Sequence, residues 1–289
     1  IFLIRFLGLG LEGAAWATLA GNYLALLLLV LLGYTRVGQR MRGTAVERLE
    51  LSFHLPQRSE LSSLSKACGP LFFVSACKNL CYLMLQSVAT SFSTTTCAAH
   101  QAMWSVWTIL SFCPTPLEQC AQVILPARIA EDAAAGEEEK EKRSWLRARE
   151  FVKCLLLVGS ALGLLLGTIT TIVVQFPSLL TKDATLWPIM SSFTPYMGIS
   201  LLLAGVCICL DGSLQAVGDL SFLWRCQAFN VVCLWLFLHL FAGKSAGIIG
   251  VWYGVVLFFG LRTAQNIWRT LRAEGILGAK KTSLKSVKF

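Results

Sequence analysis

The sequence predicts an all-α, polytopic membrane protein with seven transmembrane helices, and three observations support this fold class. Seven long apolar runs follow one another along the chain. Of the 25 Lys and Arg residues, 21 lie in every second gap between the runs or in the run ends that adjoin these gaps, three lie in the other gaps, and Lys78 lies in the middle of a run. Hydrophobic residues make up 55% of the chain and charged residues 14%, and the mean hydropathy is +0.64. A soluble protein with buried helices would not segregate its charges in this way.

Each run can cross a hydrocarbon layer of about 30 Å, which takes roughly 20 helical residues, some with tilt and some only marginally. The runs cover residues 13–34, 67–90, 96–126, 151–176, 187–212, 226–242 and 246–270. Basic loops stay on the cytoplasmic or equivalent side of a membrane, so the charge alternation also predicts the orientation. The formal net charge of +9 therefore indicates topology and contact with anionic membrane lipid, not nucleic acid.

The first and last runs open with the same pattern of glycines followed by an aromatic residue. Gly10, Gly13 and Trp16 stand just before and at the start of the first run, and Gly247, Gly250 and Trp252 stand at the start of the last. We interpret the two runs as equivalent elements of two repeats, although close packing of small residues in lipid is an alternative explanation. A repeat implies a parent of twelve helices in two lobes, with the substrate path between them.

This interpretation divides the chain into four segments. Residues 1–34 form the final helix of an N-terminal lobe, 35–66 a basic loop between lobes, 67–272 a six-helix C-terminal lobe, and 273–289 a basic tail. Ile1 is neither a start methionine nor part of a signal peptide. We therefore expect the chain to begin inside a larger protein, to need that protein's N-terminal lobe as its partner, and to be inactive alone.

Eleven cysteines lie almost entirely within the apolar runs, where we expect small buried side chains. We assign them no disulfide, and no Cys/His spacing resembles a zinc site. No metal and no cofactor is expected.

Three ionisable side chains within the runs are functional candidates, because an ionisable group in the hydrocarbon costs several kcal/mol unless it is paired or hydrated. At about 1.5 Å per helical residue, Lys78, Glu118 and Asp211 lie roughly 18, 15 and 12 Å from the basic side. We predict that Lys78 pairs with Asp211, with Glu118 as a candidate third member, and that this group couples ion movement to transport. A static ion pair that fixes helix packing is the alternative.

Neutral polar residues within the runs are candidates for the substrate path: Gln86, His100, Gln101, Gln119 and Gln122. For each glutamine, hydrogen bonding between helices is the alternative, as it is for His100. Pro114, Pro116 and Pro126 interrupt the third run, where a proline bends a membrane helix.

Five segments stand in this order along the chain: GLEGAAWAT from Gly10, AAHQ from Ala98, PLEQCAQVILP from Pro116, LDGSLQAVGD from Leu210, and GIIGVWYG from Gly247. Together they resemble the multidrug and toxic compound extrusion (MATE) family. The resemblance extends over essentially the whole chain, as helices six to twelve. It implies a secondary active antiporter that exports organic solutes, xenobiotics or phenolic and organic-acid metabolites, in exchange for H⁺ or Na⁺.

Within that family the chain most resembles the plant and algal branch that includes plastid exporters of phenolic acids such as salicylate. Lys78 and the segment Ala89–Ser91 match the seventh helix of that branch, and Asp211 and Asp219 match its tenth. The chain departs from the pattern at Glu118, where a small polar residue is expected, and at Thr115, where an acid often stands. The resemblance implies an integral membrane protein, with the plastid envelope as its location.

Three other classes fit seven crossings less well. A rhodopsin-type receptor would carry Asp-Arg-Tyr after the third run and Asn-Pro-x-x-Tyr in the last, and neither is present. A membrane-embedded enzyme would need a nucleophile and base near one face, and no such pair stands at helical spacing, so we predict no enzyme. A lipid or oligosaccharide flippase of similar architecture remains the alternative to an exporter, although its cavity would be expected to carry more basic residues.

Overall fold

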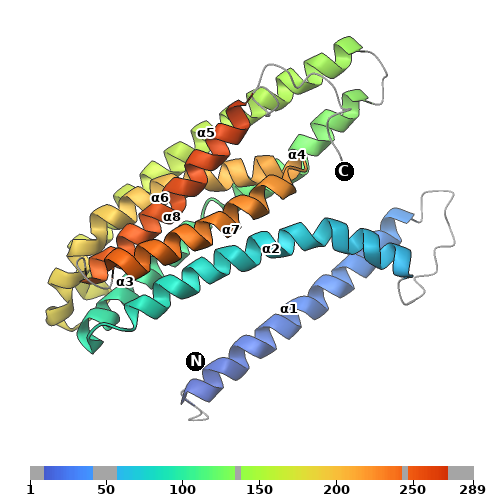
Figure 1. Ribbon diagram of the computed structural model, residues 1–289. Helices are drawn as coiled ribbons and strands as arrows, with labels where there is room; N and C mark the ends of the chain where they lie inside the picture. Colours follow the sequence, from blue (N-terminus) through green and yellow to red (C-terminus); the bar gives the residue numbers. More distant parts are fainter. Residues whose placement is uncertain (1–9, 42–56, 134–137, 243–246, 273–289) are drawn as a thin grey trace. The chain divides into compact units, whose positions relative to one another are not determined.

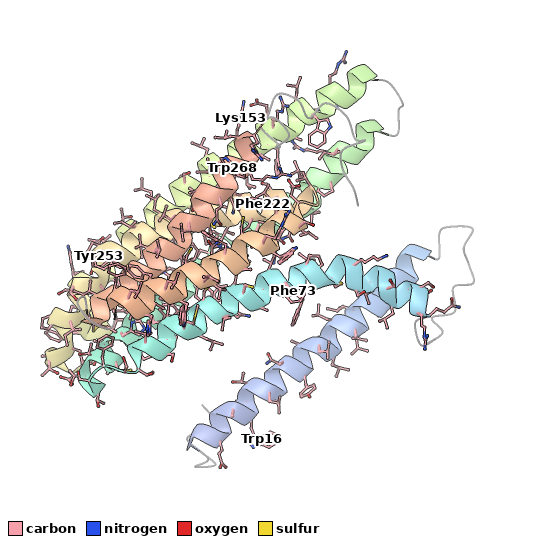
Figure 2. The ribbon with its side chains drawn as sticks, in the orientation of Figure 1. Trp16, Phe73, Lys153, Phe222, Tyr253 and Trp268 are labelled. Carbon is pink, nitrogen blue, oxygen red and sulfur yellow. The ribbon has the colours of Figure 1, made fainter. Side chains whose placement is uncertain are left out.

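The computed structural model describes residues 10–41, 57–133, 138–242 and 247–272, and all regular structure in these ranges is helical. The chain divides into two compact units, residues 1–60 and 61–289. The first contains α1 (Gly10–Met41), which begins at a glycine with a φ of 49°. Its apolar stretch Ala15–Gly33 has no buried residue, and side chains such as Trp16 project from it (Figure 2).

The second unit is a bundle of long helices (Figure 1). Its long helices are α2 (Arg58–Ala89, within this unit from Leu61), α3 (Thr94–Phe112), α4 (Thr115–Ala133), α5 (Glu138–Gln175), α6 (Trp187–Ala216), α7 (Leu220–Phe237) and α8 (Gly247–Leu271). Short 3-10 turns at Pro177–Leu179 and Ala184–Leu186 connect α5 to α6, and a π-helical turn at Leu238–Ala242 extends α7. In the second of these turns, hydrogen bonds from the Thr185 N–H and hydroxyl lower the pKa of Asp183, which caps the turn.

Six helices in the described ranges are long and apolar enough to cross a membrane. The predicted third crossing, over residues 96–126, is not one continuous helix but the pair α3 and α4. The two meet at a turn containing Cys113 and Pro114, where the Leu117 N–H donates to the Pro114 carbonyl. Proline has no N–H to donate and clashes with the preceding turn, so a helix breaks at this point. The prediction of an all-helical membrane protein is confirmed, with one crossing broken.

Helical structure extends into the predicted loop over residues 35–66 from both sides. Helix α1 continues to Met41 and α2 begins at Arg58, and residues 42–56 lie outside the described part. The predicted basic tail, 273–289, also lies outside it. The two helices of the predicted repeat begin in the same way. Helix α1 begins at Gly10 and α8 begins at Gly247, and both glycines have a positive φ, 49° and 57°.

Helix α6 occupies the centre of the bundle and packs against α3, α4, α5, α7 and α8. It approaches α5 so closely that a Cβ atom at Gly205 would lie 2.3 Å from the carbonyl oxygen of Gly159. Small residues allow this approach, and such packing drives helix association in lipid. The central position of α6 places Asp211 inside the bundle.

The outer surface of the bundle is apolar, as lipid contact requires. Phe73, Tyr253 and Trp268 are 57%, 45% and 53% exposed and point away from the core (Figure 2). All eleven cysteines are free thiols. The expectation that most of them are buried is wrong, because only Cys81, Cys207 and Cys209 are buried, and the others lie partly or fully on the outside of helices.

Candidate functional site

Asp211 lies at the centre of a buried polar cluster and accepts hydrogen bonds on both carboxylate oxygens. Oδ2 accepts from Lys78 Nζ at 2.8 Å and also forms an ion pair with Arg262 Nη2. Oδ1 accepts from Asn266 Nδ2 at 2.6 Å. The Asp211 side chain is 1% exposed, so these three donors take the place of water.

The predicted pairing of Lys78 with Asp211 is therefore present in the structure. The sequence-based prediction did not include the other two partners of Asp211, which are Arg262 and Asn266. They stand four residues apart on α8, and helical residues at this spacing share a face, so both reach the same carboxylate. In the sequence, Arg262 is the first of the basic residues toward the C-terminal end, but its side chain is 3% exposed and lies inside the bundle. The rule that singled out Lys78, an ionisable residue within an apolar run, applies equally to Arg262.

The Arg262 guanidinium also lies against aromatic rings of its own helix. Its central carbon is 5.0 Å from the ring centroid of Phe258 and 5.2 Å from that of Phe259. Cation–π contacts of this kind favour a positive charge that has lost its water. Helix α8 therefore holds Arg262 in place by its rings as well as by Asp211.

Glu118 lies near this cluster on α4 but has a different set of partners. Gln215 Nε2 donates to Glu118 Oε1 at 2.9 Å, and Gln122 Nε2 donates to Gln215 Oε1 at 3.0 Å. Among the described residues, no cation lies within ion-pair distance of the Glu118 carboxylate. Glu118, the predicted third member, therefore lies near Lys78 and Asp211 but forms no hydrogen bond or ion pair with either of them.

Close contact between α4 and α6 fixes the position of Glu118. A Cβ atom at Gly212 would lie 2.7 Å from the Glu118 carbonyl oxygen and 2.8 Å from its Cα atom. Only a residue without a side chain allows the two backbones to approach this far. Gly212 follows Asp211 directly, so one short segment of α6 sets the positions of both carboxylates.

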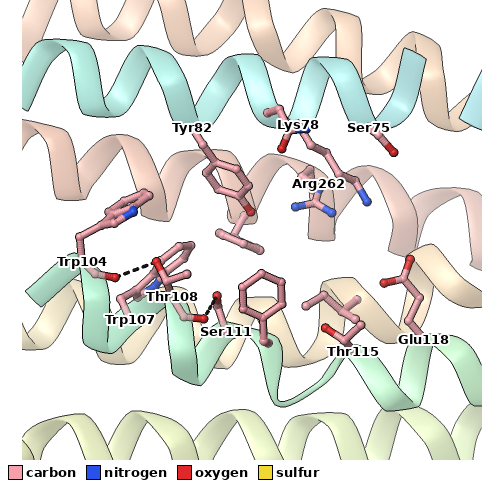
Figure 3. A pocket seen from close by; sticks show the side chains of 14 residues that line it. Ser75, Lys78, Tyr82, Trp104, Trp107, Thr108, Ser111, Thr115, Glu118 and Arg262 are labelled. Atoms are coloured by element: carbon pink, nitrogen blue, oxygen red, sulfur yellow. Dashed lines mark hydrogen bonds between the residues drawn. The ribbon is translucent and has the colours of Figure 1, made fainter. Parts of the chain in front are cut away.

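These charged groups border a cavity of about 460 Å³ (Figure 3). Lys78, Tyr82 and Ser75 reach it from α2, Arg262 from α8, and Glu118 and Thr115 from the start of α4. Aromatic rings and small hydroxyl groups line the remaining wall, and they belong mainly to α3: Trp104, Trp107, Thr108, Ser111, Phe112 and Phe259. The cavity therefore combines flat apolar surfaces with two cations and one carboxylate.

The rings of the aromatic wall pack against one another. The Tyr82 ring packs edge-on against Trp104, Trp107 and Phe258, with centroid distances of 6.2, 6.1 and 5.6 Å. Trp107 Nε1 donates to Ser200 Oγ at 2.9 Å, which fixes that ring against α6. Such a preformed pocket, with few polar groups at set positions, is typical of a small-molecule site.

The residues predicted for the substrate path lie elsewhere in the described part. Gln101 Nε2 donates to Gln86 Oε1 at 2.9 Å, which joins α3 to α2. Gln119 and Gln122 are exposed, and Gln122 belongs to the Glu118 chain of hydrogen bonds. His100 is fully buried among aromatic rings. None of the five lines the cavity, so their assignment to a substrate path stays a prediction.

Comparisons with known proteins give one family. The MatE family model matches residues 70–239. Protein DETOXIFICATION 47, chloroplastic, from Arabidopsis thaliana is 29% identical over 96% of this chain and 48% of its own length. Protein DETOXIFICATION 44, chloroplastic, from the same plant is 28% identical over 92% of this chain and 47% of its own. The chain spans about half the length of these curated relatives.

A solved structure has the same fold. It is described as the outward-facing conformation of a multidrug resistance MATE family transporter of the MOP superfamily. The match has a TM-score of 0.62 and 20% identity, and it covers 92% of this chain and 57% of that one.

Proposed function

Because this chain belongs to the MatE family, we propose that it is the C-terminal half of an integral membrane carrier that exports organic solutes. The observation that carries this proposal is the cavity of about 460 Å³ inside a bundle of membrane-spanning helices. Its rings suit a flat organic molecule, and its charged groups suit one with a polar or ionised substituent. Phenolic and other organic acids, and xenobiotics of similar size, are the proposed cargo.

The carrier works by exchange for H⁺ or Na⁺ in this proposal. Asp211 and Glu118 are the carboxylates assigned to the coupling ion, and Lys78 is the partner that responds to the charge of Asp211. A change in the charge of a buried group alters which helix contacts are favourable, and alternating access uses such differences between two states. The parent protein supplies the other lobe, so the fragment alone is inactive.

The test uses the full-length protein in proteoliposomes. We expect an imposed pH or sodium gradient to drive movement of an aromatic organic solute, and Asp211→Asn and Glu118→Gln to reduce the gradient-driven part. The exposed carboxylate Glu150, which pairs with Lys153 at 2.8 Å on α5, gives a matched control, Glu150→Gln. Gradient-driven transport that is equal in all three variants and the wild type would remove both carboxylates from the mechanism.

The location is proposed from the relatives. Two of them are named chloroplastic, and we extend this to the plastid envelope for the present protein. A fluorescent fusion of the full-length protein should label the rim of plastids. Label in the plasma membrane or vacuole would overturn this part of the proposal.

A further inference from the structure

We propose that the basic-side ends of α7 and α8 form a binding site for an anionic membrane lipid. Arg225 and Arg272 contact the negatively charged headgroup of this lipid, and the apolar outer face of α7 contacts its acyl chains. The site lies on the outer surface of the bundle, and none of its residues lines the cavity. It is therefore independent of the cargo and goes beyond the proposed function.

Two aromatic rings pack against each other where α7 begins and α8 ends. The ring centroids of Phe222 and Trp268 lie 6.3 Å apart (Figure 2). Trp268 is 53% exposed and stands close to Leu271, the last residue of its membrane-spanning stretch. An exposed Trp at such a position is typical of the interface where lipid headgroups meet the hydrocarbon. The ring pair therefore marks the level of the headgroups on the basic side.

Two arginines of α8 contact these rings, and they differ in their charge partners. Arg269 lies 5.7 Å from the ring centroid of Phe222 and donates from Nη2 to Asp219 Oδ1 at 3.0 Å, so its charge is neutralised. The guanidinium carbon of Arg272 lies 4.2 Å from the ring centroid of Trp268. Arg272 is exposed, and among the described residues it forms no ion pair. It therefore presents an unbalanced positive charge held against a flat ring.

Arg225 supplies a second positive charge of this kind from α7. It stands three residues after Phe222, so the two side chains share a face of the helix. Its Nε donates to the Ser221 carbonyl at 2.7 Å, one turn nearer the basic side. Long basic side chains reach in this way from an apolar surface toward the headgroups. Arg225 is exposed and has no ion-pair partner within the described ranges, so its terminal nitrogens can bind a headgroup.

The face of α7 that carries Arg225 continues toward the other side of the membrane as an apolar stripe. Phe229, Val232 and Leu236 follow at intervals of four, three and four residues, and they are 57%, 55% and 43% exposed. Residues at this spacing lie on one face of a helix. A charge followed by an apolar stripe fits a lipid, whose headgroup and chains are joined, better than it fits a soluble anion. Basic pockets between membrane helices on this side bind the headgroups of anionic lipids.

The experiment measures lipid binding to the full-length protein in detergent by native mass spectrometry. The probes are phosphatidylglycerol and phosphatidylcholine with identical acyl chains, so only the headgroup charge differs. Each basic residue near an anionic headgroup contributes about fivefold in affinity, and we expect the wild type to prefer phosphatidylglycerol by about 30-fold. The double variant Arg225→Gln/Arg272→Gln should bind the two lipids about equally. Each single variant should lose about fivefold, and these variants replace the double variant if it does not fold.

The matched control is Lys66→Gln/Lys153→Gln, which removes two exposed positive charges from α2 and α5 and should keep the preference. Equal affinity of the wild type for the two lipids would overturn the inference. An equal loss in the control and in the double variant would also overturn it, because the effect would then come from net charge alone. Displacement of the lipid by millimolar inorganic phosphate would show a site for a soluble anion instead of a lipid.

Discussion

Asp211 and His100 are both completely buried polar residues of this bundle, and their surroundings are opposite. Asp211 has three hydrogen-bond donors from two other helices. In the part of the chain that the structure describes, neither ring nitrogen of His100 has a hydrogen-bond partner. Its ring lies instead among Trp104, Phe193 and Trp252, at centroid distances of 5.6, 6.5 and 5.5 Å.

The difference follows from charge. Removing an ionised carboxylate from water costs so much that it must be repaid by opposite charges and hydrogen bonds. A neutral imidazole costs far less, and aromatic rings can surround it by shape alone. Asp211 therefore organises α2, α6 and α8 electrostatically, whereas His100 fills space between α3, α6 and α8.

Breaking the charged site should give the largest loss of stability. Arg262→Leu leaves Asp211 with one cation, and we expect a loss of about 3–5 kcal/mol, as for other buried pairs that lose a partner. Thermal unfolding of the full-length protein in detergent measures it. The control is Arg225→Leu, because Arg225 is exposed and donates to the Ser221 carbonyl on its own helix. Equal shifts for the two variants would show that the Asp211 cluster is not buried.

Forcing apart α4 and α6, beside the charged site, should lower the free energy of unfolding by less than Arg262→Leu does. Gly212→Ala places a Cβ atom 2.7 Å from the Glu118 carbonyl oxygen. Overpacking of this kind costs about 1–3 kcal/mol, and it should also weaken transport because Glu118 moves. Gly69→Ala on α2, where nothing lies within 4 Å, is the matched control and should be neutral or slightly stabilising. A harmless Gly212→Ala would mean that α4 and α6 are further apart than described.

The hydrogen bond between Gln86 and Gln101 joins two uncharged side chains, so its strength can be compared with that of the charged Asp211 cluster. A double-mutant cycle with leucine at both positions should give a coupling of about 0.6 kcal/mol, the average for such bonds in a membrane. The measurement is again unfolding in detergent. Coupling as large as the effect of Arg262→Leu would contradict the view that charge makes the Asp211 site special.

The aromatic site should be the most tolerant. His100→Phe keeps a flat ring and loses no hydrogen bond, so we expect a change of about 0.5 kcal/mol or less in either direction. Transport should be close to that of the wild type in the same proteoliposomes. A large loss of stability or of transport would show that His100 has a hydrogen-bond partner, such as buried water. His100 would then resemble Asp211 in depending on polar contacts.

The sequence predicts the bundle and half of the polar cluster. Lys78 and Asp211 stand out because ionisable residues are rare in apolar runs and because the two have similar depths. Arg262 follows the same rule, because it also lies in an apolar run. It stands close to the C-terminal basic residues, however, and in the sequence it looks like one of them. Pro114 indicates a possible break between α3 and α4, but a proline can also bend a helix without breaking it.

The cavity wall could not be predicted in the same way. Tyr82, Trp104 and Trp107 look like ordinary apolar residues of their runs, and only the packing of α2 against α3 shows that they face one space. The partners of Glu118 depend equally on the contact at Gly212, which no local pattern reveals. Depth along a helix can be counted from sequence, whereas rotation about its axis is set by the neighbouring helices.

The most direct test of the account fills the cavity without changing its charge. Ser111 lines it, whereas Ser105 lies exposed on the same helix and outside the lining. In proteoliposomes containing the full-length protein, Ser111→Trp should abolish transport of an aromatic organic solute, and Ser105→Trp should leave it near the wild-type rate. Equal transport by the two variants, with both correctly folded, would contradict the claim that this cavity carries the cargo.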